Sequence, residues 1–395
     1  MEVSRMTDAS EGLLELHERA GGVLFQLHGV RVPRHYGDSG AEYAAAIQGA
    51  AVVDRSHRAL LCLSGRSPAR MLTGIVSGSM PPEPFDAGDG ARKGRTEYST
   101  ILTPKGKLIT DLRLFRLEAG EAGAHLLDLP RAGLDGLLEH LKRYLPPRFA
   151  RIQELDSPPG LLTVVGPDAV RVLDRQIPGF STSPGEVESW GEGDEVVLDA
   201  EGPVGIRIVR NQDVQPLALD VVAPLPILRT LWKGLVESGV LPAGHGVWET
   251  LRIEKGRPEF GQELDRDTLP PEAGIHRRAI DHQKGCYTGQ EVIVRIRDRG
   301  RVNRHLRGFL LGEQPNPSIG TPLFIEGRDR AAGEIRSVVQ SPRFGQTIGM
   351  GYLRREAEPP TIAHLGAVDG PTVAVRALTD EGWELVERDP GRSDL

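Results

Sequence analysis

Strand–helix units that recur along the chain constrain its fold more than any other feature of the sequence. Residues 60–63 form an apolar strand pattern, and the Ser67 and Pro68 that follow are favoured at the N-cap and first position of a helix. Residues 161–165 repeat this apolar strand, and aligning Gly65 with Gly166 also aligns the strands and the helices after them. The repeat predicts an α+β protein built from two related halves.

A second pair of units follows the same logic. Residues 124–129 and 217–222 are apolar strands, and each precedes a helix whose leucines recur every three or four residues. Two α+β halves that face each other leave a cleft, which is a common place for a ligand. The other explanation is a chance match, since strand–helix units are common.

The expected secondary structure changes after residue 300. Short strand patterns separated by Gly, Pro, Asn and Asp clusters replace the longer units, and residues 354–370 read as a Pro- and Gly-containing loop. We therefore predict an α+β region over residues 1–299 and a small all-β barrel or sandwich over residues 300–395. The predicted strands are Leu306–Leu311, Thr321–Ile325, Gly333–Val339, Thr347–Leu353 and Thr372–Ala377.

Composition excludes several other classes of protein. No run approaches the ~18 apolar residues that span a bilayer, and the N-terminus has no apolar signal core, so we expect a cytoplasmic protein without membrane partners. A net charge of −7 argues against direct nucleic-acid binding. Two cysteines without a Cys-x-x-Cys pair predict neither a disulfide framework nor a structural metal site.

Cys286 stands where a thiol would be reactive. Thr288–Glu291 fits the Thr-x-x-Glu capping box, which places a helix N-terminus just after the cysteine. That positive helix end and the ammonium group of Lys284 would both favour the thiolate. The alternative is a buried structural cysteine beside a turn, and Cys62, inside an apolar strand, fits that description.

Two further sets of side chains are candidates for chemistry. The alternate arginines from Arg295 to Arg301 would share one face of an extended chain, where they would hold an anion or protect a solvated strand edge. Asp111 and Asp128 interrupt apolar strands and are acid–base candidates by residue type.

Several segments together resemble a known family. The sequence is similar to the tetrahydrofolate-binding T-protein (aminomethyltransferase) superfamily from about residue 20 to residue 380, and the Lys284–Glu291 octet resembles the signature of its YgfZ-like folate-binding branch. The other segments that carry the resemblance are Ser56–Arg58, Tyr98–Gly106, Thr250–Gly256, Phe260–Asp265 and Pro271–Gly274.

The resemblance implies a three-domain, clover-like fold in which two interleaved α+β domains are followed by a C-terminal β-barrel. Tetrahydrofolate or a derivative would lie in the central channel. The implied catalytic residues are Cys286 and Lys284. The implied cofactor-binding residues are Tyr98, Thr110, Leu112, Arg252, Phe260, Tyr287 and Arg295.

Departures from the family pattern bear on activity. The aminomethyltransferases carry two successive acids after an apolar pair, and here Thr110 stands at the first position while Asp111 keeps the second. The resemblance gives the first acid the catalytic role, so it predicts that ordinary aminomethyl transfer is lost. The segment Asn211–Gln215 also lacks the glutamate that holds the pterin in the enzymes, which predicts weaker or different pterin recognition.

The YgfZ-like branch implies an accessory protein that supports the assembly or repair of iron–sulfur clusters in client enzymes, including tRNA-modifying ones. Its partners would be folate and either the client proteins or cluster-assembly factors. The alternative is a tetrahydrofolate-dependent one-carbon transferase or demethylase of the same fold. Whether the chain is an enzyme is left open by the sequence.

Overall fold

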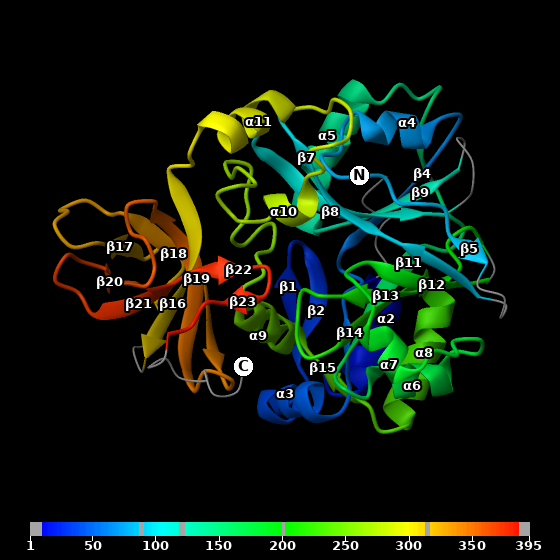
Figure 1. Cartoon of the computed structure of the whole chain (residues 1–395). Helices are drawn as coiled ribbons and strands as arrows, with labels where there is room; N and C mark the ends of the chain where they lie inside the picture. Colours follow the sequence, from blue (N-terminus) through cyan, green and yellow to red (C-terminus); the bar gives the residue numbers. More distant parts are fainter. Residues whose placement is uncertain (1–9, 87–90, 118–122, 200–201, 313–316, 387–395) are drawn as a thin grey trace. The chain divides into compact units, whose positions relative to one another are not determined.

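The computed structural model describes residues 10–86, 91–117, 123–199, 202–312 and 317–386 (Figure 1). The chain divides into two compact units. The first comprises residues 1–101, 110–248 and 279–288, and the second comprises residues 102–109, 249–278 and 289–395. The domain boundary that we placed after residue 299 stays a prediction.

Two sheets and a hairpin form the first unit. In spatial order, the eight-stranded sheet consists of β15 (Leu241–Ala243), β3 (Ala51–Asp54), β11 (Pro159–Val165), β14 (Ala218–Pro224), β13 (Ile206–Asn211), β12 (Asp194–Leu198), β6 (Arg92–Arg95) and β5 (Phe85–Asp86). The five-stranded sheet consists of β10 (Arg151–Gln153), β4 (Ala59–Ser64), β9 (His125–Leu129), β8 (Leu108–Arg116) and β7 (Glu97–Leu102). The hairpin is β1 (Val23–Leu27) with β2 (Val30–His35).

Helices of the first unit connect and cover these strands. They are α2 (Ser10–Arg19), α3 (Ser39–Gln48), α4 (Pro68–Thr73), the 3₁₀ turn η1 (Arg131–Gly133), α5 (Leu134–Tyr144), α6 (Ala169–Gln176), α7 (Pro184–Glu188) and α8 (Leu225–Glu237). Two more helices, α9 (His245–Lys255) and α10 (His276–Ala279), contain residues of both units. Within the described residues, no helix has both the length and the apolar character needed to cross a membrane.

The recurring units predicted from the sequence correspond to the two sheets. Strands β4 and β9 are antiparallel neighbours in one sheet, and β11 and β14 are antiparallel neighbours in the other; each strand is followed by a helix. The aligned glycines both adopt positive φ, +145° at Gly65 and +129° at Gly166. A Cβ there would lie 2.5 Å from Phe149 O and 2.2 Å from Gly49 O, respectively, so both positions require glycine.

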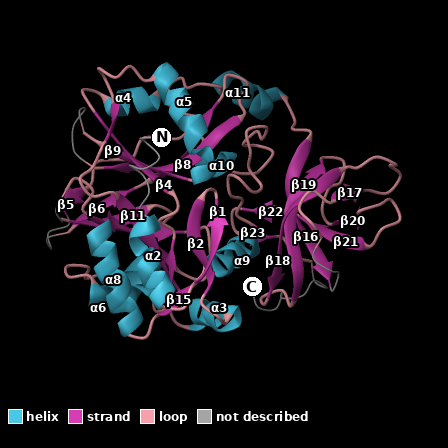
Figure 2. Cartoon of the chain, turned by 180° about the vertical axis from the view of Figure 1, so that it is seen from behind, coloured by secondary structure: helices cyan, strands magenta, loops and turns pink. Residues whose placement is uncertain are grey.

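Apolar faces of α6 and α8 bury the core of the eight-stranded sheet, and Figure 2 shows both helices beside it. On α8, residues three and four apart point inward, because one helical turn takes 3.6 residues. Each large side chain removed from water in this way contributes about 1.5–3 kcal/mol. The buried residues of α8 are Leu228, Leu231, Trp232 and Leu235.

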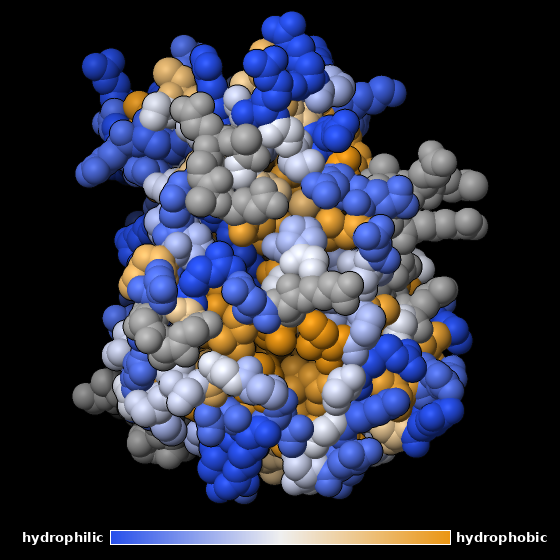
Figure 3. All heavy atoms as spheres, turned by 90° about the vertical axis from the view of Figure 1, so that its right-hand side faces the viewer, coloured by the Kyte–Doolittle hydropathy of each residue, from blue (hydrophilic) through white to orange (hydrophobic). Residues whose placement is uncertain are grey.

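An apolar hollow lies beside α8. It has a volume of about 660 Å³ and is lined mainly by apolar side chains of α8, of two strands and of the residues that follow α6, including Ile177, Ile206 and Leu231. Figure 3 views this side and shows apolar side chains around a recess in its lower half. Such a lining favours an apolar ligand over a charged one such as the folate that the sequence predicts.

A closed six-stranded barrel dominates the second unit, which confirms the predicted all-β barrel. In spatial order its strands are β16 (Arg304–Gly312), β19 (Gln346–Arg354), β18 (Gly333–Ser341), β17 (Pro322–Phe324), β20 (Thr361–Leu365) and β21 (Thr372–Arg376). Helix α11 (Gln290–Arg299) precedes the barrel, and the short hairpin β22 (Leu378–Thr379) with β23 (Gly382–Trp383) follows it.

Strand β20 corrects one expectation. Residues 354–370 were predicted to be a loop, yet Thr361–Leu365 pairs with both β17 and β21 and completes the barrel. The strand was missed because its alternation is inverted: Ile362 is 57% exposed while the small Ala363 is fully buried. A pattern with the large apolar residue outside does not indicate a half-buried strand.

Candidate functional site

The first element of the candidate site is a phenol–carboxylate pair on neighbouring strands. Tyr98 lies on β7, and its Oη donates a hydrogen bond to Asp111 Oδ2 on β8 at 2.9 Å. Asp111 is 7% exposed, whereas the tyrosine is only partly buried. A buried carboxylate is thereby held in one orientation beside a side chain that reaches solvent.

Thr110 and Leu112 point to the opposite face of β8, because side chains alternate along a strand. Both are buried in the core. A Cβ at Gly133 would lie 2.1 Å from Thr110 Oγ1, so the threonine packs directly against the start of α5. Of the two successive positions, the one that meets Tyr98 is therefore Asp111.

A buried charge cluster lies on the same face of β8 as Asp111. Arg113 Nη1 binds Asp220 Oδ2 on β14 at 2.7 Å, and Arg55 Nη1 lies 3.6 Å from Asp220 Oδ1. Thr163 Oγ1 and Asn211 Nδ2 also donate to this carboxylate, at 2.6 and 2.9 Å. Asp220 is fully buried, and its four partners satisfy both oxygens.

The arginines of this cluster favour the ionised form of Asp220. Burial by itself would raise the pKa of Asp220, but the guanidinium groups of Arg113 and Arg55 hold that pKa below its ordinary value. Arg55 also stacks over the Trp248 ring at 3.7 Å. The other acid–base candidate, Asp128, pairs with Arg58 at 2.5 Å. Asp220 and Asp128 are therefore both buried beside arginines.

Ser77 and Gly78 connect strand β7 to a distant part of the sequence. Ser77 N donates to Thr100 O at 2.9 Å, and Gly78 N donates to Ser99 Oγ at 2.8 Å. A Cβ at Gly78 would lie 3.0 Å from Tyr98 O and 3.1 Å from Ala279 O. Glycine therefore allows two chain segments to approach the strand that carries the site tyrosine.

Residues 279–288 lie along this connection. Ser77 Oγ donates to Ala279 O at 2.7 Å, and Ser79 Oγ donates to Asp281 Oδ2 at 2.6 Å. Lys284 Nζ donates to the carbonyls of Val76 and Gly78, each at 2.7 Å. Burial lowers the pKa of Lys284 to about 8, although Asp281 opposes the shift. This lysine fixes the segment to its neighbour.

Cys286 is exposed on the segment that Lys284 anchors, while Cys62 is buried in β4. Tyr287 is 7% exposed, and Lys284 Nζ lies 5.6 Å from the centre of its ring. The capping box predicted at Thr288 is wrong. Helix α11 begins at Gln290, and its N-cap is Gly289, which has a φ of +85° and makes no side-chain capping bond.

The left-handed backbone at Gly289 explains this correction. A Cβ at that position would lie 2.6 Å from Thr103 O, so the chain passes too close to its neighbour for any residue but glycine. The tight turn ends the preceding loop and delays the helix beyond the threonine. A Thr-x-x-Glu pattern describes local preference only, and it does not register such a contact.

The predicted row of arginines is also wrong. Arg295, Arg297 and Arg299 lie on helix α11, where residues two positions apart point in nearly opposite directions. Arg297 pairs with its neighbour Asp298 at 2.6 Å. Alternation in this segment therefore gives no common face, and Arg295 is an exposed helical residue.

Arg252 and Phe260 are buried in the second unit. The guanidinium group of Arg252 on α9 donates to Glu263 Oε2 at 2.9 Å and to Arg257 O at 2.6 Å. Burial opposes its charge, but Glu263 raises the pKa of Arg252. This arginine orders the turn of residues 257–263, in which Phe260 is 4% exposed. Their assignment to folate binding stays a prediction.

The Asp220 cluster is not predicted by the sequence. Its signal is present, since Arg113 and Asp220 each interrupt a strand of apolar residues. A charge in such a strand indicates either a partner in the core or a functional group. Which partner it meets depends on the sheet order, and that order is not written in either strand.

Comparison with known proteins matches the chain to one family in both of its parts. Residues 13–284 match the GCVT N-terminal domain, and residues 304–378 match the glycine cleavage T-protein C-terminal barrel domain. An aminomethyltransferase of Rubrobacter xylanophilus is 28% identical over 90% of both chains. One from Chlorobium luteolum is 25% identical over 87% of this chain and 90% of its own.

A solved structure shows the same fold. The glycine cleavage system aminomethyltransferase T from Bartonella henselae superimposes with a TM-score of 0.76 at 20% identity, covering 95% of this chain and 99% of its own. Aminomethyltransferases of this kind use tetrahydrofolate, the cofactor class that the sequence predicted. The chain belongs to the glycine cleavage T-protein family.

Proposed function

We propose that this protein is a tetrahydrofolate-dependent one-carbon transferase in which Asp111 is the acid–base residue. The observation that carries the proposal is the hydrogen bond from Tyr98 to Asp111, which holds a buried carboxylate beside a partly exposed tyrosine. The relatives are named aminomethyltransferases, and this supports the transferase interpretation over an accessory role. Thr110 does not argue against it, because its side chain faces α5.

The residues of this region fit a reduced folate. Asp111 offers carboxylate oxygens to ring N–H groups, and Tyr98 offers a hydroxyl and an aromatic face. When bound, tetrahydrofolate supplies the nitrogen atoms that accept a one-carbon unit. Asn211, in the segment that lacks the family's glutamate, donates its amide to Asp220, so its contribution is to shape the neighbouring core.

Tyr98, Asp111 and Arg113 would each have a separate role in the reaction. Tyr98 fixes the plane of the Asp111 carboxylate through its Oη. Asp111 takes a proton from a reacting amine and returns it, which a carboxylate within hydrogen-bond reach can do. Arg113, two positions along β8, ties the strand to Asp220 and so holds this face in place. Positioning of this kind is the part of catalysis that a rigid sheet supplies.

Tetrahydrofolate is expected to bind and to stabilise the protein by mass action, by about 2.7 kcal/mol at a ligand concentration one hundred times Kd. Titration calorimetry measures the affinity, and the melting temperature measures the stabilisation. Tyr98→Phe, which removes only the hydroxyl, should weaken binding. Absence of both heat and thermal shift at millimolar tetrahydrofolate would exclude the proposal.

A second candidate function rests on a different observation. Cys286 is exposed on a segment that hydrogen bonds of Lys284 and Asp281 fix in place. We propose, as the alternative, the YgfZ-like role: an accessory protein whose thiol exchanges with a thiol, persulfide or cluster of an iron–sulfur client. One exposed thiol cannot supply the thiolates of a conventional cluster, so stable cluster binding is not part of this proposal.

A strain that lacks the gene distinguishes the transferase function from the accessory function. The accessory role requires that iron–sulfur enzyme activities fall, that the wild-type gene restores them, and that Cys286→Ala does not. Cys62→Ala is the matched control, since that cysteine is buried. Full restoration by the Cys286 variant would remove the accessory role and leave the transferase.

A further inference from the structure

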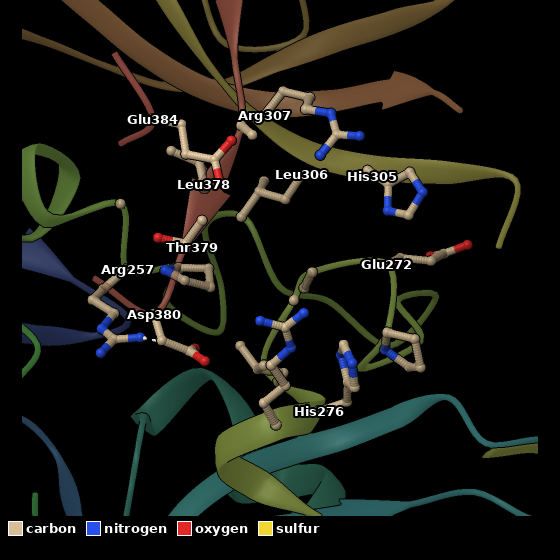
Figure 4. Close-up of a pocket in the computed structure, with 18 residues that line it drawn as sticks. Arg257, Glu272, His276, His305, Leu306, Arg307, Leu378, Thr379, Asp380 and Glu384 are labelled. Carbon is tan, nitrogen blue, oxygen red and sulfur yellow. Dashed lines mark ion pairs between the residues drawn. The ribbon is translucent and has the colours of Figure 1, made fainter. Parts of the chain in front are cut away.

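A cavity in the second unit is not used by either proposed function. It has a volume of about 330 Å³, near the lower end for small-molecule sites. Four segments line it: the turn after α9, the loop that leads into α10, the start of β16 and the residues around β22 (Figure 4). The titratable groups on its walls are Arg257, Arg277, Arg307, His276, His305, Glu272, Asp380 and Glu384.

Two of the three acids in the lining are already paired. Glu272 Oε2 binds Arg304 at 3.1 Å, and Arg304 is not part of the lining. Asp380 Oδ1 lies 3.6 Å from Arg257 Nη1, the pair marked in Figure 4. Glu384, the third acid, is exposed to solvent. The arginines of the cavity therefore outnumber the acids available to them.

Arg307 carries the unbalanced charge. Within the described part of the chain, it forms no ion pair, and its buried Nε has no hydrogen-bond acceptor. Burial lowers the pKa of Arg307, and the nearby carboxylates of Glu358 and Glu384 oppose this only in part. A cation partly removed from water without a partner is costly, and an anion in the cavity would remove that cost.

His305 lies two residues from Arg307 on β16, and Figure 4 shows both side chains on the same side of the cavity. Burial first, and then the positive charge of Arg307, lower the pKa of His305. The imidazole is therefore neutral at physiological pH and can donate one hydrogen bond without adding charge. The exposed Arg277 on α10 also makes no ion pair among the described residues.

The walls are fixed by contacts that do not involve these groups. Leu306 N donates to Glu272 O at 2.8 Å, which ties β16 to the loop before α10. Trp383 Nε1 donates to Ile253 O at 2.9 Å, which ties β23 to α9. The cavity therefore exists before a ligand arrives, and binding does not have to order it.

We propose that this cavity binds a small anion bearing a carboxylate or phosphate group, with Arg307 as its principal partner and His305 and Arg277 beside it. A guanidinium group presents two parallel N–H donors that match the oxygens of either anion. The proposal concerns the second unit alone and does not depend on the transferase or accessory role.

Titration calorimetry of the full-length protein with glutarate and with inorganic phosphate tests the proposal. We expect saturable binding of at least one, and Arg307→Gln should weaken it by at least about tenfold, as expected for a lost hydrogen bond between charged groups. Arg307→Lys keeps the charge but not the paired donors, so its affinity should fall in between. Glu384→Gln should tighten binding, because it removes a carboxylate of the lining that competes with the anion for Arg307.

Arg354→Gln is the matched control, since it removes one exposed arginine of β19 that does not line the cavity. Each variant is checked by thermal unfolding. Tetrahydrofolate then distinguishes two sources of the anion: displacement of glutarate identifies the acidic end of the folate, and no displacement identifies a free acid. Absence of binding for both probes at millimolar concentration, or equal affinity in Arg307→Gln and Arg354→Gln, would overturn the proposal.

Discussion

Replacing Asp111 with asparagine should lower kcat for one-carbon transfer to tetrahydrofolate by about 10²–10⁴-fold, the range for losing a positioned general acid or base. The amide keeps the size of the side chain and can still accept from Tyr98 Oη, so the local structure should persist. It cannot take a proton from an amine. The rate loss should therefore appear mainly in kcat, with a smaller rise in KM because the amide has one acceptor oxygen fewer for the folate ring.

Steady-state kinetics with tetrahydrofolate and a series of amine donors, including an aminomethylated lipoyl carrier, measures this effect. Asp135→Asn is the matched control, because it makes the same chemical change at an exposed position of α5. Unchanged turnover in the Asp111 variant would show that the carboxylate has no part in the chemistry. Turnover absent from the wild type with every donor would instead favour the accessory role.

Replacing Asp220 with asparagine is expected to lower the free energy of unfolding by about 3–5 kcal/mol, the range for removing one partner of a buried ion pair. The change leaves the buried guanidinium groups of Arg113 and Arg55 without the carboxylate that both of them face. Denaturation in urea measures the loss. Asp199→Asn is the control, since its ion pair with Arg92 is at the surface and should change stability by ~1 kcal/mol or less.

Asp220 should also make the stability of the folded protein depend on pH. The folded state holds the pKa of Asp220 below its ordinary value of 3.8, so the unfolded chain takes up the proton first on acidification. The stability that this carboxylate provides is fully present above pH 3.8 and is lost as pH falls below it. The difference between wild type and Asp220→Asn should therefore shrink in acid. A difference that does not depend on pH would contradict the ionic account.

Much of the fold could be read from the sequence, because its signals are local. Alternating and continuous apolar strands, each followed by a helical period, predicted β4, β9, β11 and β14 with their helices. Glycine at positions 65 and 166 marks the same positive-φ turn in both halves, a conformation that other residues adopt at a cost. Short strands between turn residues predicted the barrel in the same way.

The candidate site depends on contacts between residues far apart in sequence. The family resemblance places the catalytic position at Thr110, which cannot act as the acid. The facing of β8 in its sheet, which the sequence does not reveal, turns the neighbouring Asp111 toward Tyr98. Pairing of Arg113 with Asp220 requires two sheets to come together, and strand composition does not specify that packing.

The segment around Cys286 also has a conformation that its local sequence does not determine. Its residue types marked it as functional, but its local pattern fits both an extended chain and a helix. Tertiary contacts decide between them: the backbone of Gly289 passes against Thr103, and α11 begins only after that turn. The sequence by itself thus indicated which segments carry candidate functional groups. Only the folded chain determined which way their side chains point, because that depends on neighbours supplied by distant strands.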